Sequence, residues 1–246
     1  MLILGSDKRQ AELAKLYGVE LIPEDDKRLK KLIKKSDIIV LPISVTNPAD
    51  FVGARLGEPV GDAALGIPPS INIQNSPPVE GCLRSRRGGV LIIGRDEIIN
   101  DKTFAIQNAT PTAEGAILLA LRQSEKTLAE SQCLVLGYGN CGKEIVRLLK
   151  GFDAKVDYVD KESGGMNEDL TSYDIIFNTI PKQVLTGEEI EQISNKIILN
   201  IASHQAGFPK ECQYNAIPAK HFPVTAAKIM KETIDKIIEE EGAQNV

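Results

Sequence analysis

The sequence Cys133-Leu134-Val135-Leu136-Gly137-Tyr138-Gly139-Asn140-Cys141-Gly142 decides how the second half of this chain folds. Its apolar run ends at a Gly-x-Gly-x-x-Gly motif, a helical pattern follows over Lys143–Lys150, and a second apolar run, Lys155–Val159, ends at Asp160. Strand, glycine loop, helix, strand and acidic residue in this order are typical of a Rossmann βαβ unit. We therefore predict a dinucleotide-binding Rossmann domain over residues 131–223.

Each glycine of the motif has its own physical task. Gly137 permits a tight turn, Gly139 lets a pyrophosphate approach the backbone, and Gly142 lets the helix pack closely on the strand. The helix N-terminus adds N–H groups and a positive dipole end for the phosphates. Asp160 would accept hydrogen bonds from a ribose 2′-OH, which favours NAD, whereas Lys161 could hold a 2′-phosphate. The residues themselves leave both cofactors open.

Parallel α/β sheets bind ligands outside the carboxyl ends of their strands. In the second domain this rule selects the glycine loop and the turns after three later strands. The cofactor-binding candidates are Gly137, Tyr138, Gly139, Asn140, Cys141, Gly142, Asp160, Lys161, Asn178, Thr179, Ile180, Pro181, Ala202 and Ser203. His204 follows directly and can exchange a proton near neutral pH, so it is the catalytic candidate, with an exposed loop histidine as the alternative.

The first hundred residues alternate continuous apolar strands with helical patterns, which predicts a second parallel sheet covered on both faces. We expect strands at Met1–Leu4, Val19–Ile22, Ile38–Leu41, Val90–Ile93 and Phe104–Gln107, and helices at Lys8–Leu16 and Asp26–Lys34. The predicted fold is therefore α/β, with two doubly wound parallel-sheet domains. A flavodoxin-like substrate domain would span 1–109, a long linking helix 110–130, and a C-terminal helix 224–246.

Thr110 is the predicted N-cap of the linking helix, with Pro111 at its first position. Thr110 and Thr112 then make a candidate carboxylate site, with simple capping as the alternative. Arg84, Arg86 and Arg87 form a basic cluster in an irregular region and could bind an acidic substrate through bidentate contacts. A solvated basic loop explains these arginines equally well.

Bulk composition narrows the class of protein. Hydrophobic content of 42% and charged content of 26% are ordinary for a globular protein, and the net charge of −5 argues against a nucleic-acid-binding surface. The apolar stretches are shorter than a membrane span. The four cysteines show no metal-ligand spacing, so we expect no metal, free thiols and a cytoplasmic location.

Several segments together resemble a known family, the dehydrogenase-like A chain of dipicolinate synthase from spore-forming bacteria. The matching segments are Asn108–Gly115, Val135–Gly142, Asn178–Pro181, Asn200–Ser203 and Pro223–Ile229, and the likeness is best from about residue 100 onward. The resemblance implies a fold similar to the D-2-hydroxyacid dehydrogenases, a nicotinamide cofactor, commonly NADP, and a flavoprotein-like partner, the second subunit of dipicolinate synthase. We expect NADP, with NAD as the alternative, and a homodimer is a further expectation.

The expected reaction is NAD(P)-dependent oxidation of dihydrodipicolinate, or its hydroxytetrahydro precursor, to the dicarboxylate dipicolinate during sporulation. One alternative is a D-2-hydroxyacid dehydrogenase acting on an open-chain acid. That class needs an Arg in the second domain, and between Gly137 and Lys220 only Arg147 is present, on the helix after the glycine loop. The other alternative is a non-catalytic subunit that senses NAD(P)H or supports a partner.

Overall fold

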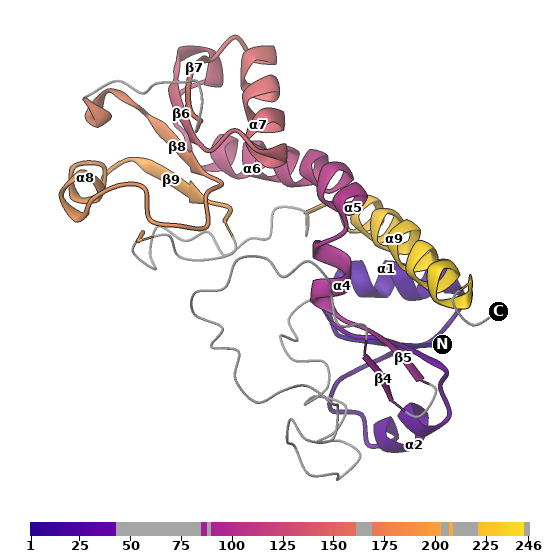
Figure 1. Ribbon diagram of the computed structural model, residues 1–246. Coiled ribbons are helices and arrows are strands. Elements are labelled where there is room, and N and C mark those ends of the chain that lie inside the picture. Colours follow the sequence, from indigo (N-terminus) through magenta and orange to yellow (C-terminus); the bar gives the residue numbers. More distant parts are fainter. Residues whose placement is uncertain (43–84, 88–89, 161–168, 203–206, 209–220, 244–246) are drawn as a thin grey trace. The chain divides into compact units, whose positions relative to one another are not determined.

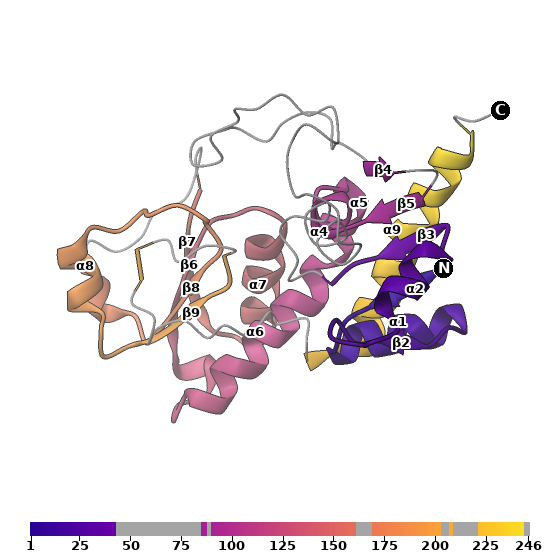
Figure 2. The ribbon, with the colours of Figure 1, turned by 90° about the horizontal axis from the view of Figure 1, so that it is seen from below.

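The computed structural model describes residues 1–42, 85–87, 90–160, 169–202, 207–208 and 221–243. Contacts divide the chain into two compact units (Figure 1 and Figure 2). Unit 1 comprises Met1–Ala105 and Pro223–Val246, and unit 2 comprises Ile106–Phe222. The C-terminal segment therefore returns to the first unit, where α9 (Pro223–Ala243) packs along α1 (Lys8–Tyr17).

Unit 1 is built on a five-stranded sheet with the order β2-β1-β3-β5-β4. The first four strands of this order are parallel, and β4 is antiparallel to β5. The elements are β1 (Leu2–Leu4), α1 (Lys8–Tyr17), β2 (Leu21–Ile22), α2 (Leu29–Lys34), β3 (Ile38–Val40), β4 (Ser85–Arg87), β5 (Val90–Ile93), α4 (Arg95–Ile99), α5 (Lys102–Gln107) and α9 (Pro223–Ala243).

Successive side chains of these strands pack into two separate hydrophobic cores, one on each face of the sheet. Ile3, Val40 and Ile93 pack with residues of α1, α4 and α9, whereas Leu4, Ile39 and Ile92 pack with residues of α2. Because successive residues of a strand point to opposite faces, helices cover this sheet on both sides. Unit 1 is thus doubly wound, as predicted.

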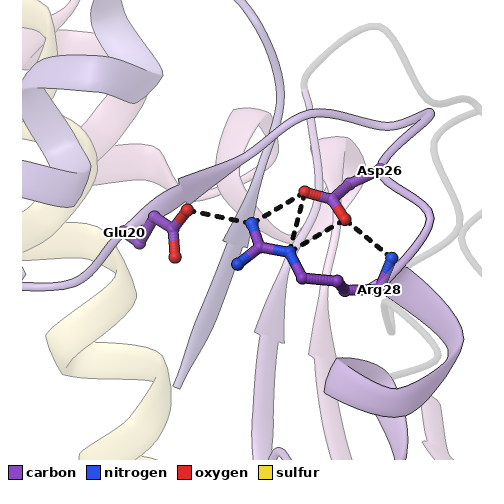
Figure 3. A network of polar contacts seen from close by, with 3 residues as sticks. All are labelled: Glu20, Asp26 and Arg28. Atoms are coloured by element: carbon purple, nitrogen blue, oxygen red, sulfur yellow. Dashed lines mark hydrogen bonds and ion pairs between the residues drawn. The ribbon is translucent and has the colours of Figure 1, made fainter.

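Helix α2 begins at Leu29 rather than at Asp26 because a local turn occupies the preceding residues (Figure 3). Asp26 Oδ1 accepts a hydrogen bond from the Arg28 backbone N–H at 2.7 Å. The Arg28 guanidinium also binds Asp26 Oδ2 at 2.8 Å and Glu20 Oε1 at 3.0 Å. The Arg28 hydrogen bonds hold the pKa of Asp26 below its ordinary value.

Unit 2 is built on a four-stranded parallel sheet with the order β7-β6-β8-β9. The elements are α6 (Ala109–Gln123), η2 (Leu128–Glu130), β6 (Gln132–Leu136), α7 (Asn140–Gly151), β7 (Lys155–Val159), η3 (Leu170–Ser172), β8 (Ile175–Asn178), α8 (Gly187–Gln192) and β9 (Ile197–Asn200). Cys133 and Val135 pack with residues of α6 and α7, and Leu134 and Leu136 pack with residues of α8 and η3. The predicted Rossmann architecture is confirmed.

The expected strand at Phe104–Gln107 is wrong, because this segment lies in helix α5. Asp101 starts the helix: its Oδ1 accepts from the Phe104 backbone N–H at 2.8 Å, and its carbonyl accepts from the Ala105 N–H at 2.9 Å. A side chain that satisfies the first orphan N–H groups favours a helix over the extended form that Phe and Ile prefer.

The predicted bounds of the long helix are also wrong. Helix α6 has Asn108 at its N-cap and ends at Gln123, so Thr110 and Pro111 lie in its first turn. Proline is tolerated there because the first N–H groups of a helix have no partner within it. The helix packs its alanines and Ile117 into the core of unit 2.

The basic cluster is not an irregular loop throughout. Arg86 and Arg87 lie in β4, which pairs antiparallel with β5 at the edge of the unit 1 sheet. This antiparallel edge strand departs from the predicted all-parallel sheet. Arg84 lies outside the described residues.

Candidate functional site

The carboxyl ends of the unit 2 strands lie in register. Leu136 pairs with Val159 on one side and with Asn178 on the other, and Asn178 pairs with Asn200. The residues that follow these positions therefore form one row along a single sheet edge. The chain runs from β6 to β7 on one side of it and then from β7 across to β8 on the other side, so the glycine loop lies at the switch point where such sheets bind ligands.

Gly137 and Gly142 are required by the protein itself. Gly137 has φ 101°, in the left-handed region, and a Cβ there would overlap the Thr179 hydroxyl and lie 2.8 Å from Ile180 Cγ1. A Cβ on Gly142 would overlap the Gly137 carbonyl oxygen. The Thr179 hydroxyl is fixed in turn, because it donates to the Leu136 carbonyl at 3.0 Å. These two glycines are therefore explained by backbone packing alone.

Gly139 is different, because nothing in the described part of the chain requires a glycine there. Its φ of −76° is ordinary, and a Cβ would meet no atom within 4 Å. Gly139 is also the N-cap of α7, and no side chain caps this helix. Asp7 caps α1 and Thr186 caps α8 through side-chain hydrogen bonds, whereas the N-caps of α2 and α6, like that of α7, make none. An uncapped helix start beside open space fits the pyrophosphate of a dinucleotide.

Unit 1 offers no equivalent at the carboxyl end of β1. Asp7 Oδ1 accepts from the backbone N–H groups of Arg9 and Gln10, and its Oδ2 binds the Arg9 guanidinium at 2.6 Å. Burial alone would raise the pKa of Asp7, but the Arg9 and Gln10 hydrogen bonds lower it below its ordinary value. A carboxylate already occupies this helix start, so a second nucleotide is not expected there.

The Asn178–Pro181 turn is held by its own polar contacts. Asn178 is fully buried, and its Nδ2 donates to Asn200 Oδ1 at 2.9 Å and to the Ile180 carbonyl at 3.0 Å. Its Oδ1 accepts from the Ile180 N–H at 3.2 Å. Both amide protons of Asn178 are used within the protein, so its side chain positions this turn. Thr179 and Ile180, which are partly exposed, remain candidates for cofactor contact.

The structure places most cofactor candidates on this edge. Tyr138, Asn140 and Cys141 lie in the loop and the first turn of α7, Asp160 follows β7, and Ala202 follows β9. Burial raises the pKa of the Cys141 thiol, which keeps it protonated at neutral pH. Lys161, Ser203 and the catalytic candidate His204 lie outside the described residues.

Thr110 and Thr112 lie in the first turn of α6 rather than at its N-cap, and the carboxylate site there stays a prediction. Thr110 is exposed inside α6, whereas Thr112 is buried and its backbone N–H donates to the Asn108 carbonyl at 3.2 Å. The Thr112 hydroxyl also accepts from Asn108 Nδ2 at 3.4 Å. Both contacts join Asn108 to Thr112 and so stabilise the first turn of α6.

Two side chains near the loop were missed from the sequence. Tyr158 of β7 stacks on Tyr138, and the Lys143 ammonium lies 5.6 Å from the Tyr138 ring centroid. Tyr158 stands two residues before Asp160, so strand alternation could have placed it at this edge. No sequence signal indicated that Lys143 would reach Tyr138.

The described residues offer neither a metal site nor a membrane-spanning helix. These contain no group of three His, Cys, Asp or Glu residues arranged to hold a metal ion. None of the helices seen in this part of the chain has the length and hydropathy needed to cross a lipid bilayer.

The sequence and the fold are similar to those of the A chain of dipicolinate synthase. The sequence is 27% identical to this protein from Bacillus subtilis (strain 168) over 187 residues, which are 65% of the chain. The match spans 61% of the length of that relative. No protein-family model matches the chain.

Solved structures extend the likeness in fold over nearly the whole chain. The dipicolinate synthase A chain from Bacillus subtilis superposes with a TM-score of 0.63 at 16% identity, covering 99% of this chain and 96% of that one. The corresponding protein from Bacillus halodurans gives a TM-score of 0.63 at 19% identity, covering 96% of each chain. The resemblance predicted from the motifs is confirmed.

Proposed function

We propose that this chain is a nicotinamide-dinucleotide-dependent oxidoreductase that acts as the A chain of dipicolinate synthase does. It would oxidise dihydrodipicolinate, or its hydroxytetrahydro precursor, to dipicolinate. The observation that carries the proposal is the uncapped start of α7 beside the open position of Gly139, at the switch point of a Rossmann sheet. The 27% identity to the Bacillus subtilis protein supports the choice of substrate.

Different residues of unit 2 would bind different parts of the cofactor. Backbone N–H groups of Asn140 and Cys141 would bind the pyrophosphate, and Asp160 would contact the adenosine ribose. Thr179, Ile180, Pro181 and Ala202 would line the nicotinamide half, and Ser203, outside the described residues, is a further candidate for this role. When bound, the nicotinamide ring supplies the hydride-accepting chemistry.

The rest of the proposed reaction concerns the substrate and the residues that would contact it. Dihydrodipicolinate loses one hydride and one proton, and this leaves an aromatic ring. Aromatisation makes the step strongly downhill, so the protein has to orient the substrate and accept a proton, a role we assign to His204. Arg84, Arg86 and Arg87 remain the candidates for binding the two carboxylates. The flavoprotein-like second subunit of dipicolinate synthase is the proposed partner.

Turnover by the purified chain tests this function. With NADP⁺ and dihydrodipicolinate, we expect NADPH to form in step with dipicolinate, measured by absorbance. If activity appears only after the flavoprotein-like partner is added, that partner completes the enzyme. Dinucleotide binding without turnover under either condition would contradict the enzyme and favour the sensor or scaffold.

Cofactor choice is tested by Asp160→Ala. We propose that NADP binds at least as well as NAD, and a carboxylate at the end of β7 opposes a 2′-phosphate. Removing it should raise NADP affinity roughly two- to fivefold, the scale of an exposed charge interaction, and should not raise NAD affinity. Calorimetric titration of both cofactors measures the change. Equal weakening of both would assign Asp160 a purely structural role.

A further inference from the structure

Two tyrosines join the glycine loop to the end of β7. The rings of Tyr138 and Tyr158 stack with centroids 4.1 Å apart and an angle of 18° between their planes. Tyr138 stands between Gly137 and Gly139, and Tyr158 is the penultimate residue of β7. The stack thus fixes the spacing of the two segments that flank the adenosine half of a dinucleotide in this fold.

Lys143 adds a positive charge to this stack. It is the fourth residue of α7, it is exposed, and its ammonium lies 5.6 Å from the Tyr138 ring centroid. This distance is within the range of a cation–π contact. The contact holds the Lys143 charge close to the glycine loop.

The position of Lys143 is electrostatically unfavourable within the protein itself. The first turn of a helix carries the positive end of the dipole, where a cation is repelled and an anion is stabilised. Among the described residues, Lys143 forms no ion pair that would offset this repulsion, whereas Arg147, on the next turn, binds Glu144 at 2.8 Å. A bound anion would pair with the Lys143 charge and would also be stabilised by the positive end of the α7 dipole.

We propose that Lys143, positioned by the Tyr138–Tyr158 stack, binds the adenosine 2′-phosphate of NADP. The inference rests on the proposed function, because it assigns part of the same cofactor site. Asp160 follows Tyr158 by two residues, a span of about 7 Å in extended chain. The Lys143 charge therefore lies within the reach of one nucleotide from Asp160 and would offset the carboxylate's repulsion of a 2′-phosphate.

The test separates the 2′-phosphate from the rest of the cofactor. Adenosine 2′,5′-bisphosphate and 5′-AMP are titrated by calorimetry into the wild type and Lys143→Gln, with NADPH and NADH titrated in parallel. Loss of one hydrogen bond to a charged group at the lower end of its usual strength predicts roughly tenfold weaker binding of the bisphosphate and of NADPH. Affinities for 5′-AMP and NADH should stay unchanged.

Two further variants sharpen the result. Lys143→Arg keeps the charge and should retain the preference for the 2′-phosphate. Lys150→Gln removes an exposed lysine from the other end of α7, where the dipole favours a cation, and should change none of the affinities.

An unchanged preference in Lys143→Gln, or equal weakening of all four ligands, would overturn the inference and leave the dinucleotide site intact. A wild type that binds neither dinucleotide would overturn the proposed function and this inference together.

Discussion

Gly139→Val is expected to lower NAD(P) affinity at least tenfold, about 1.4 kcal/mol, while the protein stays folded. The backbone at Gly139 is extended, with φ −76° and ψ −165°, which a β-branched residue adopts readily. No atom lies within 4 Å of the added Cβ. The free energy of unfolding should therefore change by no more than about 1 kcal/mol, the scale of an N-cap effect.

The branched side chain would occupy the space where a pyrophosphate must touch the backbone at the start of α7. Calorimetric titration measures the affinity, and urea denaturation followed by circular dichroism measures the stability. Gly187→Val is the matched control, because Gly187 also lies at a helix start with nothing near its Cβ position. Unchanged cofactor affinity in a folded Gly139→Val protein would show that no dinucleotide binds at the start of α7.

Unlike Gly139→Val, Gly137→Ala is expected to lower the stability of the fold, and the loss of cofactor affinity follows from that. With φ 101°, an alanine is strained, and its Cβ would overlap the Thr179 hydroxyl. Backbone strain of about 1–3 kcal/mol and overpacking of a similar size predict a loss of about 2–6 kcal/mol in the stability of unit 2. Affinity for NAD(P) should fall as well, because the loop and the Thr179 turn shift together.

The midpoint of urea unfolding reports this loss of stability. Gly187→Ala provides the control: its Cβ meets nothing within 4 Å, and alanine is the better helix former, so stability should hold or rise slightly. A Gly137→Ala protein as stable as the wild type would mean that the turn between β6 and α7 does not need its left-handed residue.

The second unit could be predicted because its signals are local. The apolar run of β6, the glycine motif and the apolar run of β7 each specify their own segment, and the order of the three specifies the fold. The same holds for α1, where Asp7 starts the helix and Gly18, with φ 65°, ends it in the left-handed conformation.

Errors arose where a segment's conformation depends on partners distant in sequence or on competing local signals. Arg86 and Arg87 are in a strand because β5 lies beside them, and no pattern within the segment shows this. At Thr110 the pair Thr-Pro favoured a helix start, yet the chain turns into α6 at Asn108, and Pro111 fits within the first turn. The Tyr138–Tyr158 stack likewise joins two segments whose approach depends on the folded βαβ unit.

Direct calorimetric titration of the wild-type chain with NADPH and NADH tests whether a dinucleotide binds at the start of α7. We predict saturable binding of one dinucleotide per chain, with NADPH at least as tight as NADH, and a loss of at least tenfold in Gly139→Val. Absence of binding by either dinucleotide up to about millimolar concentration would contradict the account.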